Sequence, residues 1–471
     1  MSKKAQRVTA LVGAGAALEI VPKDSGITIP STANITKEVL KKYNTVNGAG
    51  TVVIDIYKHL CKNRILSPLP LFSDESYRIM HFEVIFQIME ILHSYDKVWF
   101  FDSTPYDGKG KIEHFRYDLF PEIAGFVKST FRHDPKELNQ CLEEYIRRIM
   151  NIVNQYDDYF RTHINSPECR WYKNFWSTRK LKWDVFNLNY DTTIEQCIPY
   201  EDGFVMLPAS DIRRMDMKRL MDNKSQKSTI NHIHGCIVYG NDDLSTEEYR
   251  EKIMGKYDVT DFFKYKDYVS TPKHWWSDDV AQNRHSHVPV PLITGLDKTD
   301  KIVGLPFSAY RQNFEKQILE NNALLIVGYS YGDAYINSML ERMRQIHGDK
   351  QRIVLIDYWG DVVSKYNEGV KEEVKYWRTH GHHKRSTEEL RIDYLKSLIK
   401  DAIGFNQGLN EHEGTLITNT IMDHVENINV EFDMNSANGP LVSKNKQLMI
   451  FFRGFKDAAK HRKEIYAFLN S

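Results

Sequence analysis

Short apolar or alternating runs recur along the chain, and each ends at glycine or at polar residues. The clearest of them are residues 7–12, 183–188, 204–207, 229–238, 323–327 and 352–356. Runs of this length, rich in Val, Ile and Leu, are typical of buried strands. Between the last two lies a stretch at helical spacing, 335–346, which predicts a strand–helix–strand unit of the parallel type. We therefore expect an α/β fold built on a Rossmann-like parallel sheet.

The pattern changes between residues 75 and 180, where apolar positions recur at helical spacing. Residues 81–93 and 138–159 show this most clearly, and each stretch predicts an amphipathic helix. We expect a large, mostly helical insertion at 75–180 inside a domain that spans residues 5–360. Beyond residue 360 the strand pattern fades. Residues 361–471 are therefore predicted to be a mixed C-terminal region and a candidate contact surface for a partner or another copy of the chain.

Two polar residues follow the strand at 183–188. Asn189 and Asp191 are two positions apart, so in extended backbone their side chains point to the same face. Thr192 and Glu195 have the spacing of a capping box, which predicts that a helix begins there. Open α/β sheets place ligand-handling groups at such strand ends. An Asx turn with no role in binding is the alternative interpretation.

The first strand ends at a tight turn, Gly13-Ala14-Gly15-Ala16. Glycines let the backbone come close to a phosphate, and the N–H groups of a helix start favour anionic oxygens. The turn lacks the third glycine of the GxGxxG motif, so a plain strand-to-helix connection is the alternative.

The other strand ends carry histidine, serine and acidic residues. His232 and His234 alternate within 229–238, so they are predicted to share one face of that strand. The strand at 323–327 is followed by Gly328, Ser330 and Asp333, and the strand at 352–356 by Asp357.

In a parallel sheet all these strand ends lie along one edge, so residues far apart in sequence are predicted to meet around one crevice. Each could bind a different part of a dinucleotide. The Gly13 turn suits the pyrophosphate, Ser330 suits a phosphate or ribose, and Asp357 can accept hydrogen bonds from the adenosine ribose. Asn189 and His234 are left for the other end of the dinucleotide.

The charge balance, the cysteine spacing and the length of the apolar runs exclude several classes of function. Lys plus Arg and Asp plus Glu both number 63, so no global basic field argues for nucleic-acid binding. The five cysteines form no CxxC pair, which suits reduced thiols in a cytoplasmic protein. No run approaches the roughly 20 apolar residues that a membrane helix needs, so no membrane contact is expected. The histidines at 380, 382 and 383 lack a Cys or carboxylate at ligand spacing, and we expect a solvated loop there and no metal.

Four of these motifs, in this order across about residues 5–360, resemble the sirtuin family. The likeness is closest to its bacterial, sirtuin-like NAD-cleaving branch. The motifs are Gly13-Ala14-Gly15-Ala16 for the Gly-Ala-Gly turn, Asn189-Tyr190-Asp191 for Asn-x-Asp, His234-Gly235 for His-Gly, and Gly328-Tyr329-Ser330 for Gly-x-Ser. Three departures accompany them: the zinc-binding cysteine pairs of the protein deacylases are absent, Ala17 stands where the family often has serine, and the helical insertion is large. All three fit the sirtuin-like NADases associated with antiphage defence.

The resemblance implies an enzyme that binds NAD as substrate, with no metal, and hydrolyses its nicotinamide–ribose bond to nicotinamide and ADP-ribose. Asn189 and His234 would be the catalytic pair, with Asp191 orienting them or stabilising positive charge. The NAD contacts implied are Gly13, Ala14, Gly15, Ala16, Gly328, Ser330, Asp333 and Asp357. As an antiphage effector it would deplete NAD under the control of a homo-oligomer, a co-encoded defence partner, or both.

Two other functions fit the same residues. The chain could sense NAD or ADP-ribose without cutting it, as a regulatory binding module. It could also be a protein ADP-ribosyltransferase or deacylase, which would need a groove for an acceptor peptide. An isolated His-Gly is more often structural than catalytic, so the other strand ends carry the catalytic interpretation.

Overall fold

The computed structural model describes eleven stretches of the chain. These are residues 6–43, 82–83, 85–89, 135–207, 211–222, 227–240, 262–268, 291–294, 304–331, 333–358 and 440–471. The histidines at 380, 382 and 383 lie outside them, as do residues 75–81, 84 and 90–134 of the predicted insertion.

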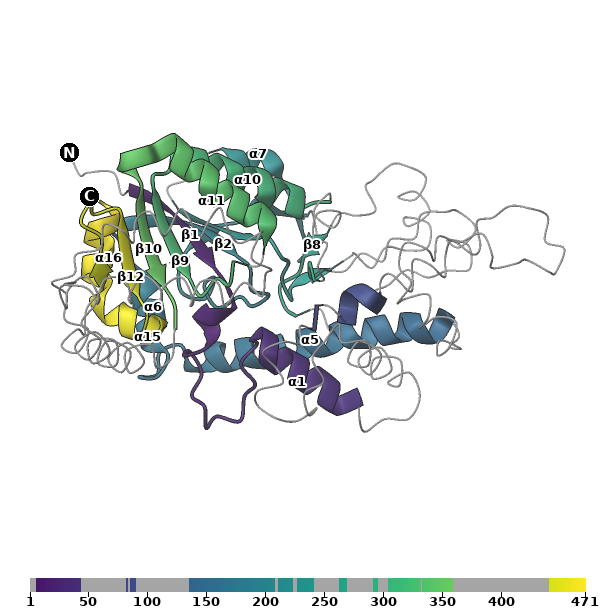
Figure 1. The fold of residues 1–471 in the computed structure, drawn as a ribbon. Helices are drawn as coiled ribbons and strands as arrows, with labels where there is room; N and C mark the ends of the chain where they lie inside the picture. Colours follow the sequence, from purple (N-terminus) through teal and green to yellow (C-terminus); the bar gives the residue numbers. More distant parts are fainter. Residues whose placement is uncertain are drawn as a thin grey trace, which may run out of the picture.

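The described part is organised around an eight-stranded sheet (Figure 1). Its order is β11-β12-β10-β9-β1-β2-β6-β3, and every neighbouring pair is parallel except β11 with β12. The strands are β1 (Gln6–Val12), β2 (Leu181–Asn187), β3 (Tyr200–Glu201), β6 (Ser228–His232), β9 (Ala323–Val327), β10 (Arg352–Ile356), β11 (Leu441–Val442) and β12 (Leu448–Phe451). From β1 the chain builds outward through β2 and β6 on one side, then through β9, β10 and β12 on the other. This is the doubly wound order of a Rossmann-type fold.

Alternation along β1 sends its side chains to two separate cores. Val8, Ala10 and Val12 pack on one face with helices α6 (Arg170–Trp176), α15 (Phe455–Ala458) and α16 (Arg462–Leu469). Leu11 packs on the other face with α10 (Phe307–Glu320) and α11 (Ala334–His347). Because both faces are covered, the strands are apolar throughout, as parallel strands usually are.

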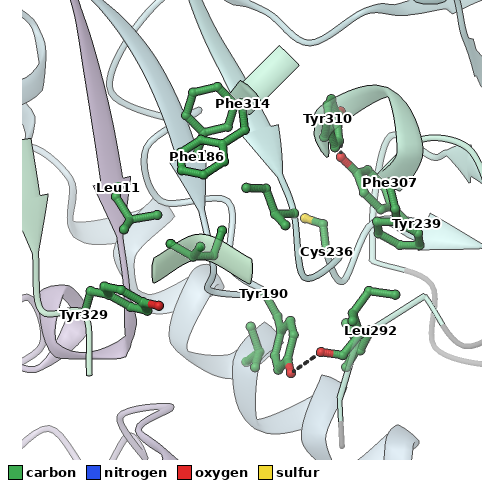
Figure 2. Packing of buried hydrophobic residues seen from close by; sticks show 14 of the residues in the cluster. Leu11, Phe186, Tyr190, Cys236, Tyr239, Leu292, Phe307, Tyr310, Phe314 and Tyr329 are labelled. Atoms are coloured by element: carbon green, nitrogen blue, oxygen red, sulfur yellow. Dashed lines mark hydrogen bonds between the residues drawn. The ribbon is translucent and has the colours of Figure 1, made fainter. Parts of the chain in front are cut away.

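Aromatic side chains fill the second core close to the carboxyl edge of the sheet. Phe186 of β2 meets Phe314 of α10 edge-on, with ring centroids 4.8 Å apart. Figure 2 shows these two rings, with Tyr190 and Tyr329 nearer the strand ends. Tyr190 donates its hydroxyl to the carbonyl of Ile293 at 3.4 Å. The residues that follow β2 and β9 therefore pack against a buried aromatic cluster.

The described part of the predicted helical insertion is mostly helical, with turns at residues 164–169 and no helix at 177–180. Helix α5 (Pro135–His163) covers and extends the predicted 138–159, and residues 82–83 and 85–89 are helical. The amide of Phe82 donates to Thr36 of α1 (Thr32–Tyr43) at 2.9 Å, and Tyr145 of α5 donates to the Phe82 carbonyl at 2.9 Å. These bonds join α1, the short helical stretch and α5, which lie side by side in Figure 1.

Three local predictions were wrong. The strand predicted at 229–238 ends at His232, because the chain turns through Gly235 with φ +95°. The apolar run at 204–207 contributes β4 (Phe204–Met206) to a separate antiparallel sheet, which also holds β5 (Arg213–Met215), β7 (Tyr239–Gly240) and β8 (Phe263–Lys264). The predicted helix after Asp191 is an irregular turn at residues 193–197.

The C-terminal region contains strands that the pattern did not indicate. β12 pairs in parallel with β10, so Leu448 to Phe451 belong to the same sheet as β1. The division at residue 360 stays a prediction, but residues 440–471 complete the sheet and one of its cores. None of the helices in the described part of the chain combines the length and apolar character that a bilayer crossing requires.

Candidate functional site

Two glycine turns meet where the strand order reverses, between β1 and β9. The Gly13 amide donates to the Val327 carbonyl at 2.9 Å, and the Gly15 amide to the Gly328 carbonyl at 3.0 Å. A Cβ on Gly13 would lie 2.5 Å from the Gly328 oxygen, and one on Gly15 would lie 2.7 Å from the Gly328 Cα. Only glycine allows the two backbones to come this close. Doubly wound folds bind dinucleotides at this place.

The turn after β1 is a single 3-10 turn, Ala14–Ala17. The Ala16 amide donates to the Gly13 carbonyl at 3.0 Å, so the amides of Gly13, Gly15 and Ala16 are all paired within the protein. A phosphate at this turn would compete with those acceptors. The roles predicted for Ala14 and Ala16 as NAD contacts stay predictions.

Asn189 follows β2 and is anchored to the first glycine turn. Its Nδ2 donates to the Gly13 carbonyl at 3.0 Å, and its own amide donates to Oδ1 of Asn187 at 3.0 Å. A carbonyl only accepts, so this contact fixes which end of the Asn189 amide is the nitrogen. No hydrogen bond to another described residue engages the Asn189 Oδ1. That oxygen is therefore available as an acceptor beside the turn.

Asp191 does not share a face with Asn189, contrary to prediction. The chain bends at residues 189–190, and the buried Asp191 carboxylate accepts from the amide and hydroxyl of Thr193, at 3.1 and 2.5 Å. This is the Asx-type turn that the sequence left as the alternative. The capping-box prediction fails with it, because Thr192 binds Asp157 instead. The predicted catalytic role of Asp191 stays a prediction.

Asp157 of α5 anchors the turn after β2 through hydrogen bonds. It accepts from the amide and hydroxyl of Thr192, at 2.9 and 2.6 Å, and from Gln196 at 3.1 Å. Burial, and next the charge of Asp191, raise the pKa of Asp157 from 3.8 to about 7. Arg161 contacts the carboxylate at 3.2 Å, but its side chain is 52% exposed, so water screens this pair. Nothing in the sequence pattern distinguished Asp157 from the other acidic residues of its helix.

The raised pKa of Asp157 predicts a pH-dependent stability. Between about pH 4 and 7 the Asp157 carboxyl keeps its proton in the folded protein but has lost it in the unfolded chain. The free energy of unfolding should therefore fall by about 1.4 kcal/mol per pH unit as pH rises through that window. Asp157→Asn removes this contribution and should raise Tm at pH 8, measured by thermal unfolding. Asp158→Asn, next to it but 50% exposed, is the matched control and should leave the slope unchanged. An equal slope in wild type and Asp157→Asn would contradict this assignment.

His234 lies beyond β6 and contacts the loop beyond β9. Its Nε2 is 3.0 Å from Oδ2 of Asp333, and the two side chains are 7% and 10% exposed. The other carboxylate oxygen of Asp333 accepts from the amides of Tyr335 and Ile336, at 3.0 and 3.2 Å, and so caps helix α11. The structure therefore joins two predicted site residues. It gives Asp333 a contact with His234 that the sequence did not indicate.

His232 and His234 do not share a face, because the strand ends between them. Nε2 of His232 contacts Oε1 of Glu195, and its Nδ1 is 3.3 Å from the Asn189 carbonyl. Burial disfavours the charged carboxylate, but His232 outweighs burial and holds the pKa of Glu195 below its usual range. Glu195 was predicted to cap a helix, and its partner is instead a histidine of the neighbouring strand. The sequence contained no signal for this pair.

Four segments form a closed ring of contacts: the Gly13 turn, the loop after β9, the end of β6 with His234, and the residues after β2. Asn189 binds the Gly13 turn, this turn packs on Gly328, and the loop after Gly328 carries Asp333 to His234. Two residues before His234, His232 contacts the Asn189 carbonyl. Asp191 and the exposed Ser330 contribute no contact to this ring.

A cavity of about 630 Å³ opens on the β9–β10 side of the glycine turns. Of the predicted residues, Gly15, Gly328 and Asp357 line it, whereas Asn189, His234 and Ser330 do not. Its wall also includes Glu19 and Gly454, which the sequence did not single out. Glu19 accepts from the Lys456 amide at 2.8 Å, and a Cβ on Gly454 would lie 2.4 Å from the Glu19 carboxylate. The cavity and Asn189 thus lie on either side of one turn.

Residues 184–383 match the family model described as a SIR2-like domain. The matched range contains Asn189, His234, Gly328, Asp333 and Asp357, and begins after the Gly13 turn. Among curated proteins, none matches the chain. The match supports a sirtuin-like domain in this chain, and such domains are often NAD-dependent enzymes.

Proposed function

We propose that the chain is an NAD glycohydrolase that cleaves the nicotinamide–ribose bond and releases nicotinamide and ADP-ribose. The observation that carries the proposal is the ring of contacts at the switch point, which ties Asn189 and His234 to the two glycine turns. The SIR2-like match over residues 184–383 supports it. The close backbone approach at Gly15 and Gly328 fits a dinucleotide, and the adjoining cavity has the size range of small-molecule sites.

NAD would lie across the glycine turns, with its adenosine ribose toward Asp357 in the cavity. Its nicotinamide ribose would lie toward Asn189 and His234. Nicotinamide leaves as a neutral molecule from a cationic linkage, and the ribose carbon becomes oxocarbenium-like as the bond breaks. The site therefore needs groups that hold the sugar and activate water. The Oδ1 of Asn189 can accept from a ribose hydroxyl or guide the water.

His234 would be the general base. Asp333 can only accept when ionised, so it favours the tautomer with the proton on Nε2. The lone pair of the neutral imidazole then lies on Nδ1. From there it can take a proton from the attacking water or from a ribose hydroxyl near pH 7. Asp333 thus acts through His234, as a positioning residue.

This role predicts a specific effect of Asp333→Asn. Asparagine retains the cap on helix α11, since its Oδ1 still accepts from the Tyr335 and Ile336 amides. Its Nδ2 would face Nε2 of His234 and favour the other tautomer. We expect kcat for NAD cleavage to fall by roughly 10–10³-fold with KM nearly unchanged. If KM rises while kcat stays the same, Asp333 contacts NAD directly, as the sequence predicted.

We further propose that the enzyme is a regulated effector of antiphage defence. An unrestrained NADase would exhaust the NAD of its own cell, so low basal activity and control by an oligomer or a co-encoded partner are expected. The SIR2-like match and the helical segment around α5 support a sirtuin-like domain with an added surface for such contacts.

The test is an incubation of NAD with the full chain, alone and with the products of neighbouring genes, followed by chromatography of nicotinamide and ADP-ribose. We expect equimolar release of both products, at least when the partner is present. Tight NAD binding without nicotinamide release under either condition would favour the sensing module instead.

A further inference from the structure

Three potential metal ligands lie together close to the proposed site in sequence. Glu195 comes from the turn after β2, His232 is the last residue of β6, and Cys236 follows the Gly235 turn. One ligand atom from each lies within 4.8 Å of the other two. Within the described ranges, this is the one group of three or more His, Cys, Asp or Glu with that proximity.

The Gly235 turn brings Cys236 back toward His232. Gly235 has φ +95°, and a Cβ there would lie 2.0 Å from the Pro291 oxygen, so only glycine fits. Cys236 is fully buried and lies in the apolar cluster with Tyr239 and Leu292 (Figure 2). A thiol and an imidazole that are fully buried therefore face a carboxylate that is almost fully buried.

The orientation of His232 suits a metal ligand. Its Nδ1 is 3.3 Å from the Asn189 carbonyl, which only accepts, so Nδ1 carries the proton. Without a metal, Nε2 shares a proton with Glu195; when an ion displaces that proton, the Nε2 lone pair faces the space between Glu195 and Cys236. Metal-binding histidines are usually held in this way, with the second ring nitrogen donating to a carbonyl or carboxylate.

Glu195 supplies an independent observation. Its side chain is 7% exposed, and its Oε2 is buried without a hydrogen-bond partner among the described residues. An unpaired buried carboxylate oxygen is costly. A cation between Glu195, His232 and Cys236 would satisfy this oxygen, and Lys264 does not do so, because its ammonium binds Asp202 at 2.6 Å.

From these contacts we infer that Glu195, His232 and Cys236 bind a divalent ion of the Zn²⁺ class. Thiolate, imidazole and carboxylate together suit Zn²⁺, whereas Mg²⁺ and Ca²⁺ prefer oxygen ligands alone. The ion would replace the direct contact between Nε2 and Glu195, with each ligand atom at about 2.0–2.3 Å and a water completing the tetrahedron. Binding releases the Cys236 thiol proton, and any proton shared by Nε2 and Glu195, to solvent.

The ion would join two stretches of the proposed site. Glu195 and Asn189 both follow β2, and Cys236 follows His234 by two residues. The inference does not depend on NAD cleavage, because the ligand set and its burial stand apart from any substrate. Sequence spacing alone did not indicate it, since Glu195 lies 37 residues before His232.

The experiment measures bound zinc in the untagged full chain after equilibration with Zn²⁺ and removal of free metal. We expect about one Zn²⁺ per chain in wild type and less than about a tenth in Cys236→Ser. Cys169→Ser is the matched control, because Cys169 is equally buried but its thiol donates to the Ile20 carbonyl, at 3.4 Å, and among the described residues it is in no such group of ligands. It should bind as much zinc as wild type.

A second readout keeps the inference testable if Cys236→Ser does not fold. Titrating wild type with Co²⁺ should produce a thiolate-to-metal charge-transfer absorption, which the histidines near residue 380 cannot produce because they carry no sulfur. Equal zinc content in wild type and a folded Cys236→Ser would overturn the inference. So would the lack of both stoichiometric zinc and the cobalt–thiolate band, which would leave Glu195 and His232 as a buried ion pair alone.

Discussion

Replacing His234 by alanine is expected to lower the rate of nicotinamide release from NAD by roughly 10²–10⁴-fold, the usual contribution of a general base. The imidazole is held by Asp333 at 3.0 Å and is nearly buried. Without the imidazole, water would have to accept the proton. The loss should appear in kcat more than in KM, because His234 acts on the reacting groups.

Asn189→Ala should have a comparable effect by a different route. It removes both the free Oδ1 and the Nδ2 contact with the Gly13 carbonyl, so KM should rise together with the fall in kcat. His163→Ala is a suitable control, since this exposed histidine bonds to Thr162 and Tyr159 of its own helix and is not among the predicted site residues. Steady-state rates close to wild type in both site variants would remove the catalytic assignment.

Gly328→Ala is expected to destabilise the protein by roughly 3–5 kcal/mol, combining left-handed strain with overpacking. Gly328 has φ +57°, and a Cβ there would lie 2.4 Å from the Ala16 nitrogen and from the Gly15 carbonyl carbon. Both obstacles are backbone atoms, which no side-chain rotation can relieve. The two turns would have to separate, so NAD affinity should fall as well.

Gly348→Ala separates strain from overpacking. Gly348 also has a positive φ, +47°, but a Cβ there would meet no atom within 4 Å. With ψ −125° this backbone lies outside the left-handed helical region, so strain alone should cost roughly 1–3 kcal/mol. Thermal unfolding of both variants measures the difference. An equal loss of Tm in both would contradict the close approach of the two glycine turns.

The parallel strands could be predicted because burial on both faces makes them continuous apolar runs. Residues 323–327 and 352–356 match β9 and β10, and the helix between them begins and ends within one residue of its predicted bounds. β12 was missed because its four apolar residues, Leu448 to Phe451, follow a region without α/β rhythm. Its place is set by pairing with β10, which local sequence does not encode.

The site was predicted in its location and not in its contacts. Parallel topology alone places Gly13, Asn189, His234 and Gly328 at one edge. Which side chains meet depends on the turns beyond the strand ends, where Asn187 and Gly235 redirect the chain. Asp191 therefore accepts from Thr193. His234 contacts Asp333, which lies 99 residues away in sequence.

The central claim is that an amide and an imidazole from separate strands converge on the ribose carbon that bears nicotinamide. The most direct measurement is an experimental structure of the slow His234→Ala variant with NAD bound. We expect the nicotinamide ribose within hydrogen-bonding reach of the Asn189 Oδ1, beside the space that the imidazole vacates, and the adenosine ribose near Asp357. NAD bound with its nicotinamide ribose remote from Asn189 and from position 234 would contradict the account.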